Sequence, residues 1–399
     1  MSEARTHDAL LANYRRAPVA FVSGQGAVLT ATDGKKYLDF LSGLATSSLG
    51  HGHPRLVQAL QEQAARYIHV SNLYEIPEQS RAAELLVAAS KRHGGPGLDR
   101  VFFCNSGAEA NEAAIKLARK WGGAQDKSAI VSTVGGFHGR TMGALAATGT
   151  PQYQEAFKPL PGGFRSVPLN DIEAMKDTVD PATCAVLLEP IQGEAGVLPA
   201  DPGYLAEVQA LCRERGALFI LDEVQTGIGR TGEAFAFQRE GLEPDIVALA
   251  KGMGGGVPVG AMMAREEVAK HLVPGDHGST FGGNALSAAA VVAVLETVID
   301  DAFLERVRVA GERMRQRIDS FAQAAGVLET RGAGLMVGLE IRGEAAPVAA
   351  LCLERGLLLN AVRAQSLRLL PPLVVTDEEI DAALDVLETA LVEAAGEAP

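Results

Sequence analysis

Two apolar runs decide the fold of this chain: ALFILDEVQ at residues 217–225 and IVALAKG at residues 246–252. The first run leads into Asp222 and the second into Lys251. Short continuous apolar runs of this kind are typical of strands that are buried on both faces of a parallel sheet. Ligands of α/β proteins bind at the carboxyl ends of such strands, so we expect Asp222 and Lys251 to lie together at one sheet edge.

Strand and helix signals alternate through the middle of the chain. Further apolar runs lie at residues 101–104, 129–132 and 185–188, and helical patterns begin near residue 107 and span 203–215. This order predicts an α/β fold whose large, mostly parallel sheet is covered on both faces. Residues 285–325 are helical in pattern, and residues 328–395 mix short strands with a final amphipathic helix, which predicts a smaller α+β domain.

We therefore expect three segments: an N-terminal segment 1–54 that belongs to the small domain, a large ligand-binding domain 55–285, and a C-terminal small domain 286–399. Asp33 and Gly34 separate two strand-like runs in the first segment and predict a hairpin. Periodicity alone leaves open whether this hairpin joins the small domain or covers the large one.

Composition excludes several classes of function. The chain has 399 residues and a formal net charge of −13, which argues against a nucleic-acid or anionic-membrane partner. Its four cysteines are scattered and predict buried, reduced thiols rather than a disulfide or metal site. We expect no metal, no membrane span and no secretory signal, and therefore a cytoplasmic location.

Lysine and aspartate together point to pyridoxal phosphate. The Lys251 amine can form a Schiff base with an aldehyde, and the Asp222 carboxylate can hold a pyridinium nitrogen protonated. A lone lysine at this position would be interpreted as a solvated charge at a strand end. The surrounding motifs reverse that interpretation.

A phosphate site is predicted next to the strand at residues 101–104. Ser106 and Glu109 form a Ser-x-x-Glu capping box, and the residues that follow have helical spacing. The first amides of the helix, at Ser106, Gly107 and Ala108, would bind an anion, and Gly107 would allow its close approach. An ordinary capped helix is the alternative.

A glycine-rich loop at residues 135–141 carries candidates for ring and substrate contacts. Phe137 is suited to stacking on a flat ring, and Arg140 to gripping a carboxylate with two hydrogen bonds. The alternative is a core phenylalanine and a surface ion pair. His138 is expected to be a structural hydrogen-bonding residue rather than a catalyst.

Arg368 lies in the apolar run LRLLPPL at residues 367–373 and would be costly to bury without a carboxylate partner. Glu194 is the candidate partner, and a purely structural ion pair is the alternative. Ser279 and Thr280 offer two hydroxyls for phosphate or substrate oxygens, although alone their loop would be interpreted as a turn.

Taken together, these segments resemble the class III (subgroup II) aminotransferases, which depend on pyridoxal phosphate (PLP), and among them most closely the acetylornithine aminotransferases. The resemblance runs from about residue 13 to near the C-terminus, and its motifs occur in the family's order. They are NSGAEANE at 105–112, FHGRT at 137–141, EPIQGE at 189–194, LDEVQTG at 221–227, LAKG at 249–252 and GSTFGGN at 278–284. The resemblance implies the aspartate aminotransferase-like fold, fold type I.

The resemblance also implies a role for each cofactor-binding residue. Lys251 would hold PLP covalently and move protons, and Asp222 would pair with the pyridine nitrogen. The remaining assignments are Val224 and Phe137 on the two ring faces, Gln225 on the phenolic oxygen, and Ser106, Gly107 and Ala108 around the phosphate. Thr280 would reach the phosphate of a neighbouring subunit, which implies a homodimer with shared active sites.

On the substrate side, the resemblance places Arg140 and Ser279 against the amino donor. Arg368 would bind the α-carboxylate of 2-oxoglutarate or glutamate, and Glu194 would pair with it when the other substrate is bound. Ornithine δ-aminotransferases have a tyrosine where this chain has Leu44, and that tyrosine helps to hold a free α-amino group. Leu44 favours an acylated one.

The expected reaction moves the terminal amino group of N-acetylornithine to 2-oxoglutarate, giving N-acetylglutamate semialdehyde and glutamate for arginine biosynthesis. Acetyl-lysine, carrier-linked lysine, succinylornithine, ornithine and 4-aminobutyrate remain alternative donors. A PLP-dependent aminomutase, racemase or decarboxylase would present Lys251 and Asp222 in the same way. The pair of Glu194 and Arg368 favours an aminotransferase, because it suits an enzyme that must accept two different substrates.

Overall fold

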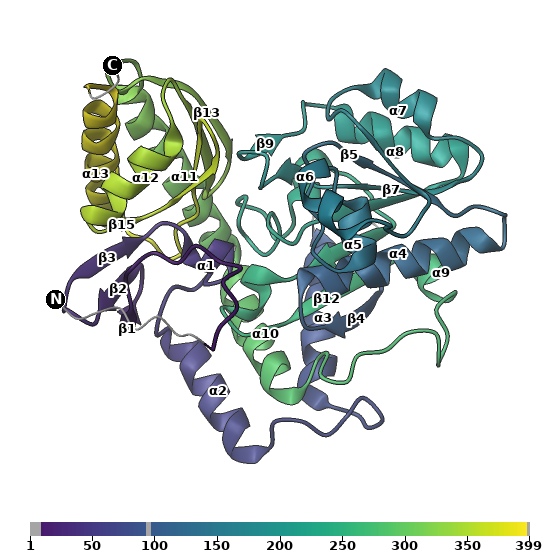
Figure 1. The fold of residues 1–399 in the computed structure, drawn as a ribbon. Coiled ribbons are helices and arrows are strands. Elements are labelled where there is room, and N and C mark those ends of the chain that lie inside the picture. The colour runs from purple at the N-terminus through teal and green to yellow at the C-terminus, as the bar shows by residue number, and fades with distance from the viewer. Residues whose placement is uncertain (1–8, 93–96, 397–399) are drawn as a thin grey trace.

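A seven-stranded sheet forms the centre of the larger lobe in the computed structural model, which describes residues 9–92 and 97–396 (Figure 1). The strands, in spatial order, are β4 (Arg100–Cys104), β12 (Gly260–Ala264), β11 (Ile246–Leu249), β10 (Leu218–Asp222), β7 (Thr183–Leu188), β5 (Ala129–Thr133) and β6 (Phe164–Val167). The pairs from β11 to β6 are parallel, whereas β12 is antiparallel to both of its neighbours. The expected α/β fold with a mostly parallel sheet is confirmed.

Both faces of this sheet are buried, which explains the continuous apolar runs. Along β10, Phe219 and Leu221 pack into one core, while Leu218 and Ile220 pack into another. The first core contains Val208 of helix α8 (Tyr204–Arg215), and the second contains Leu117 of helix α4 (Gly107–Gly123). Because side chains alternate across a strand, each position of β10 from 218 to 221 meets a helix-covered face.

Other helices complete the larger lobe. They are α2 (Pro54–Arg66), α3 (Pro77–Ser90), α5 (Met142–Ala147), α6 (Pro151–Gln154), α7 (Ile172–Thr178), α9 (Glu266–Ala269) and α10 (Ala285–Val298). Helix α10 packs against α2 and α3, and α7 packs against α8. Of the helices within residues 9–92 and 97–396, none is long and apolar enough to cross a membrane.

The smaller lobe contains two four-stranded sheets. One has the order β13 (Val327–Ala333), β14 (Met336–Ile341), β17 (Ser366–Leu369) and β16 (Asn360–Arg363), and the other β1 (Phe21–Gln25), β2 (Val28–Ala31), β3 (Lys36–Asp39) and β15 (Leu357–Leu358). Helices α11 (Asp301–Ala325), α12 (Ala345–Glu354) and α13 (Asp377–Gly396) lie beside them (Figure 1). The predicted hairpin is β2 and β3, and β3 pairs in parallel with β15, so the N-terminal hairpin joins a C-terminal strand. Division of the chain at residues 54 and 285 stays a prediction, and residues 1–8 and 397–399 of its outer segments lie outside the described part.

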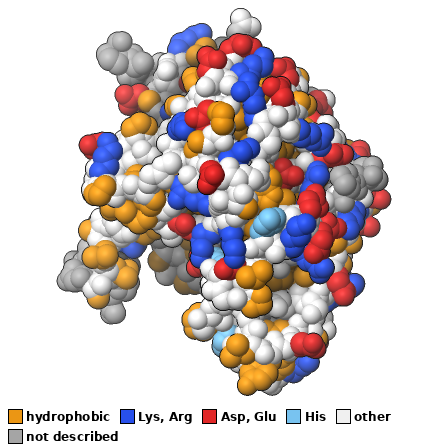
Figure 2. Space-filling model, turned by 90° about the vertical axis from the view of Figure 1, so that its right-hand side faces the viewer, with side chains coloured by type: hydrophobic (Ala, Val, Ile, Leu, Met, Phe, Trp, Pro, Cys, Tyr) orange, Lys and Arg blue, Asp and Glu red, His pale blue; other side chains and the backbone are white. Residues whose placement is uncertain are grey.

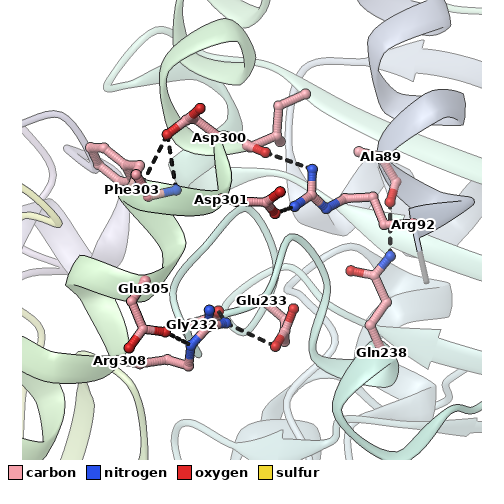
Figure 3. A network of polar contacts seen from close by, with 12 residues as sticks. Ala89, Arg92, Gly232, Glu233, Gln238, Asp300, Asp301, Phe303, Glu305 and Arg308 are labelled. Carbon is pink, nitrogen blue, oxygen red and sulfur yellow. Dashed lines mark hydrogen bonds and ion pairs between the residues drawn. The ribbon is translucent and has the colours of Figure 1, made fainter.

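A polar network fastens the start of α11 to the larger lobe (Figure 3). Arg92, just after α3, donates to Asp301 at the first turn of α11. Arg308, two turns further along, donates to the Gly232 carbonyl at 2.6 Å and to Glu233 at 2.9 Å. These contacts hold the long helix that carries the chain from the large sheet into the smaller lobe.

Candidate active site

The ends of β10 and β11 meet at one cavity, as the two apolar runs predict. Asp222 ends β10, and the parallel register places it beside Ala248, three residues before Lys251. The cavity has a volume of about 440 Å³. Of the predicted site residues, those that line it are Ser106, Gly107, Ala108, Phe137, Arg140, Glu194, Asp222, Val224, Gln225 and Lys251.

Asp222 is a buried carboxylate held by three donors. Its Oδ2 accepts from Asn111 Nδ2 at 2.7 Å and contacts His138 Nδ1 at 2.8 Å, and its Oδ1 accepts from the Val224 amide at 3.0 Å. Burial opposes protonation of His138, but the hydrogen bond and charge of Asp222 outweigh it and raise the pKa of that imidazole. The arrangement fixes the carboxylate and favours the protonated form of the imidazole beside it.

Lys251 lies in a strained and desolvated setting. Its φ is +40°, a left-handed conformation that costs free energy in a residue other than glycine. Burial lowers the pKa of its amine below the ordinary 10.5, against the opposing charge of Glu194. A lowered pKa increases the fraction of neutral amine, the form that acts as nucleophile and base.

The predicted capping box is only half formed. Ser106 Oγ accepts from the Glu109 amide at 3.2 Å and caps α4 as expected. The Glu109 carboxylate, however, accepts from the Asn105 amide at 2.7 Å rather than from Ser106, because it reaches back one residue further. A Cβ on Gly107 would lie 2.8 Å from Val224 Cγ1, so this glycine brings the helix start against the 222–225 turn.

Arg368 is fully buried on β17 and pairs with Glu194. Its Nη1 donates to Glu194 Oε1 at 2.7 Å, to the Gly193 carbonyl at 3.0 Å and to Gln225 Oε1 at 3.2 Å. Within the described residues its Nη2 has no hydrogen-bond partner. Burial raises the pKa of Glu194, but the charge and hydrogen bond of Arg368 outweigh it and hold that pKa below its ordinary value.

Phe137 and Arg140 stand at the cavity on the loop after β5. The Arg140 Cζ lies 5.3 Å from the centre of the Phe137 ring and 3.8 Å from that of Tyr153. In the part of the chain that the structure describes, no carboxylate pairs with Arg140, so the surface ion pair considered as its alternative does not form. The Phe137 amide donates to Glu189 at 2.8 Å.

Four predicted residues do not line the cavity of the single chain. Arg368 is fully buried and contacts Glu194 and Gln225, which do line it. Ser279 Oγ accepts from Asn105 Nδ2 at 3.1 Å, which places it behind the phosphate-site turn. Thr280, next to it, is exposed to solvent. Leu44 is 43% exposed, although Thr46 of the same segment does line the cavity.

Sequence reasoning missed Asn111 and Glu189, which both line the cavity, whereas His138 makes a hydrogen bond of the structural kind expected of it. Burial and the nearby charge of Asp222 raise the pKa of Glu189 to about 7. Glu189 follows the end of β7 just as Asp222 ends β10, so the rule for strand ends would have found it. Asn111 lies on the buried face of α4, where a polar residue among alanines was the available signal.

Comparison with known proteins agrees with this geometry. Residues 10–391 match the aminotransferase class-III family. The chain is 48% identical to an acetylornithine aminotransferase of Methanothermobacter thermautotrophicus over 95% of both chains. It is 49% identical to one of Caldanaerobacter subterraneus subsp. tengcongensis, over 96% of this chain and 97% of the other.

A solved structure of the ornithine aminotransferase of Toxoplasma gondii ME49 superposes with a TM-score of 0.92 at 33% identity, covering 98% of this chain and 94% of that one. The fold, the Lys251 and Asp222 pair and these relatives lead to one conclusion. The chain belongs to the class III aminotransferases, enzymes that move amino groups with the help of pyridoxal phosphate.

Proposed function

We propose that this aminotransferase takes the terminal amino group of N-acetylornithine and passes it to 2-oxoglutarate, giving N-acetylglutamate semialdehyde and glutamate in arginine biosynthesis. The observation that carries the proposal is the near-full-length identity of 48% and 49% to two acetylornithine aminotransferases. Ornithine is the second candidate donor, because the Toxoplasma gondii structure with a TM-score of 0.92 has that name.

The residues at the cavity fit PLP. The unpaired first amides of α4 at Gly107 and Ala108 suit its phosphate, and the buried Asp222 carboxylate suits its pyridine nitrogen. When bound, the cofactor supplies an electron sink and an aldehyde carbon. We assign covalent attachment to Lys251, with Val224 and Phe137 on the ring faces and Gln225, Ser106 and Thr280 as further cofactor contacts.

Lys251 is the base of the proposed reaction. Its Nζ takes a proton from the substrate carbon that bears the amine, and burial favours the neutral amine that can do so by lowering the pKa of Lys251. Asp222, positioned by Asn111 and His138, would pair with the ring nitrogen of the cofactor and favour its protonated form. The Asp222 carboxylate keeps its position because both supporting side chains are themselves buried.

The two substrates meet different arginines. Arg140 contacts the amino donor, and within the described residues it makes no ion pair that a substrate carboxylate would have to displace. Ser279, which does not line the cavity of the single chain, would contact the donor from a neighbouring subunit. Arg368 receives the α-carboxylate of 2-oxoglutarate, which would also supply an acceptor for its buried Nη2, an atom without a hydrogen-bond partner within the described residues. Glu194 must leave Arg368 for this to happen, and it returns when N-acetylornithine is bound.

A homodimer with shared sites is part of the proposal. Leu73 is 87% exposed, Tyr74 is 70% exposed and Phe281 is 60% exposed. Asn72 donates to the carbonyls of Ser279 and Gly282, both at 3.0 Å, so these apolar side chains belong to one surface. Figure 2 shows apolar side chains gathered toward the lower end of one face. Such a surface favours a protein partner, and Thr280 lies on the same loop.

The location in the cytoplasm is also proposed, from the biosynthetic role of the named relatives. Sedimentation of the purified protein tests the homodimer: a dimer is expected, and a monomer at micromolar concentration would contradict it. Mixing two inactive variants, Lys251→Ala and Thr280→Ala, would restore part of the activity if sites are shared between subunits.

The experiment that tests the function follows the cofactor's visible absorbance. Adding N-acetylornithine without a keto acid should remove the band, and adding 2-oxoglutarate should restore it with formation of glutamate. The ratio of kcat/KM for N-acetylornithine to that for ornithine then decides between the two donors. An aminomutase, racemase or decarboxylase would form no glutamate, and that result would refute the proposal.

A further inference from the structure

Arg140 rests on an aromatic shelf made by Tyr153 and Phe137. The Tyr153 ring lies directly under the guanidinium, with Cζ 3.8 Å from the ring centre. The two rings meet edge to face, 6.1 Å apart at 88°. Tyr153 itself does not line the cavity, whereas Arg140 and Phe137 do.

We propose that Tyr153 is a positioning residue that holds Arg140 ready for the carboxylate of the amino donor. The inference rests on the proposed function, since it concerns the same donor. It adds a residue outside the cavity whose effect on the reaction is exerted through the guanidinium alone.

The aromatic shelf occupies only the flat side of the Arg140 guanidinium. A guanidinium is planar and its five N–H donors point outward in that plane. A cation over an aromatic ring is attracted to the ring face, so the contact uses the flat side of Arg140 and leaves the N–H edge free. A carboxylate partner would have occupied the same edge that a substrate carboxylate requires.

The shelf is itself well anchored. Tyr153 belongs to α6 (Pro151–Gln154), and its amide donates to the Thr150 carbonyl at 3.0 Å. Gln154, the next residue, donates from Nε2 to the carbonyls of Leu145 at 3.0 Å and Thr148 at 2.8 Å. These bonds tie α6 to the end of α5, so the ring stays in place when no substrate is bound.

The contrast with Arg368 supports this interpretation. Arg368 is held by the Glu194 carboxylate at 2.7 Å, which an incoming carboxylate must displace. A substrate carboxylate does not have to displace Tyr153 from Arg140, because an aromatic ring does not compete for the hydrogen bonds of the guanidinium. The Tyr153 hydroxyl is not needed for this role, so phenylalanine should replace tyrosine without loss.

The test compares Tyr153→Leu, Tyr153→Phe and wild-type holoenzyme with N-acetylornithine and with N-acetylputrescine, the same donor without its carboxylate. Tyr153→Leu is expected to raise the KM for N-acetylornithine by about 3- to 10-fold, the range for losing one such contact, with kcat nearly unchanged. Its KM for N-acetylputrescine should not change, and Tyr153→Phe should behave as wild type.

Phe157→Leu is the matched control, because it removes an exposed aromatic ring four residues further on the same segment. It should leave both KM values unchanged. Melting temperatures of all variants exclude misfolding, and Tyr153→Met offers a second non-aromatic side chain if the leucine variant melts early.

Three outcomes would overturn the inference. They are an unchanged KM for N-acetylornithine in both non-aromatic variants, an equal rise for N-acetylputrescine, or a loss in Tyr153→Phe as large as in Tyr153→Leu. Failure of the proposed function gives a different result, in which the wild type itself does not use N-acetylornithine. Ornithine and putrescine then replace the two donors with the same expectation, and a wild type that uses neither overturns both proposals.

Discussion

Replacing Glu194 by glutamine should make Arg368 easier for a substrate carboxylate to reach. The guanidinium is fully buried, and its contact with Glu194 is the one ion pair it makes within the described residues. In the proposed function, the α-carboxylate of 2-oxoglutarate or glutamate binds Arg368 and must break that contact. The measured affinity for these substrates therefore includes the free energy of the Glu194 contact.

The magnitude follows from what glutamine keeps. A hydrogen bond to a charged group contributes about 1.5–3 kcal/mol and a neutral one about 0.5–1.5 kcal/mol. Glutamine keeps a hydrogen-bond acceptor for Arg368, whose guanidinium stays charged, and removes only the opposite charge. The contact, 2.7 Å in the wild type, therefore falls from the upper toward the lower end of the range for charged groups, by about 1–1.5 kcal/mol. About 1.4 kcal/mol corresponds to a tenfold change, so we expect the KM for glutamate and for 2-oxoglutarate to fall by roughly 5- to 13-fold.

The assay is the isolated half-reaction, with glutamate titrated against the cofactor's visible absorbance. The pKa of Glu194 lies below its ordinary 4.5, because Arg368 outweighs the effect of burial, so the effect should be constant above about pH 6. Glu340→Gln is the matched control, since Glu340 pairs with Arg331 at 2.7 Å with the same 29% side-chain exposure. An unchanged or higher KM for glutamate in Glu194→Gln would refute the reasoning.

Three other predictions concern separate parts of the chain. Lys251→Ala should abolish transfer and the cofactor's visible band, and a variant that keeps turnover would contradict the assignment of the base. Leu44→Tyr should shift kcat/KM from N-acetylornithine toward free ornithine, and an unchanged ratio would remove Leu44 from the specificity argument. Burial raises the pKa of Glu223 from 4.5 to about 7, so between these two pH values Glu223 takes up a proton when the chain folds. The contribution of this proton to the stability of the folded state is lost as the pH rises through about 7. The stability of wild type relative to Glu223→Gln should therefore be greater at pH 5 than at pH 8, by at most about 3 kcal/mol, as thermal unfolding of the cofactor-free protein would reveal.

The parts of the site that could be predicted are indicated by residues that lie next to them in the sequence. Asp222 and Lys251 each follow an apolar run whose length and composition indicate a buried strand, and the rule for strand ends brings them together. Ser106 precedes a run of helical spacing and caps α4 as expected. In each case a few neighbouring residues determine both the element and the place where it ends.

The parts that could not be predicted depend on how distant elements are arranged. Strand β12 reads GAMMA, a run with no β-branched residue, and nothing local indicates that it enters the sheet antiparallel between β4 and β11. Asn111 and His138 support Asp222 from two other segments of the chain. Asn111 lies 27 residues before His138, and His138 lies 84 residues before Asp222. Such contacts follow from strand order, which periodicity does not encode.

Arg368 and Arg140 differ in how far the sequence alone predicts their partners. An arginine within an apolar run is costly to bury without a partner, so a carboxylate was predicted for Arg368, and Glu194 is that partner. Arg140 is exposed at its loop, and the sequence alone allowed either an ion pair or a free guanidinium. The structure places it on Tyr153, from a helix that no motif indicated. One guanidinium is thus blocked by a charge that its ligand must displace, and the other is held by a ring that leaves its donors free. Under the proposed function, that difference provides one carboxylate site that must be vacated by Glu194 and one that no carboxylate of the described residues occupies, which suits a ping-pong reaction in which two substrates enter in turn.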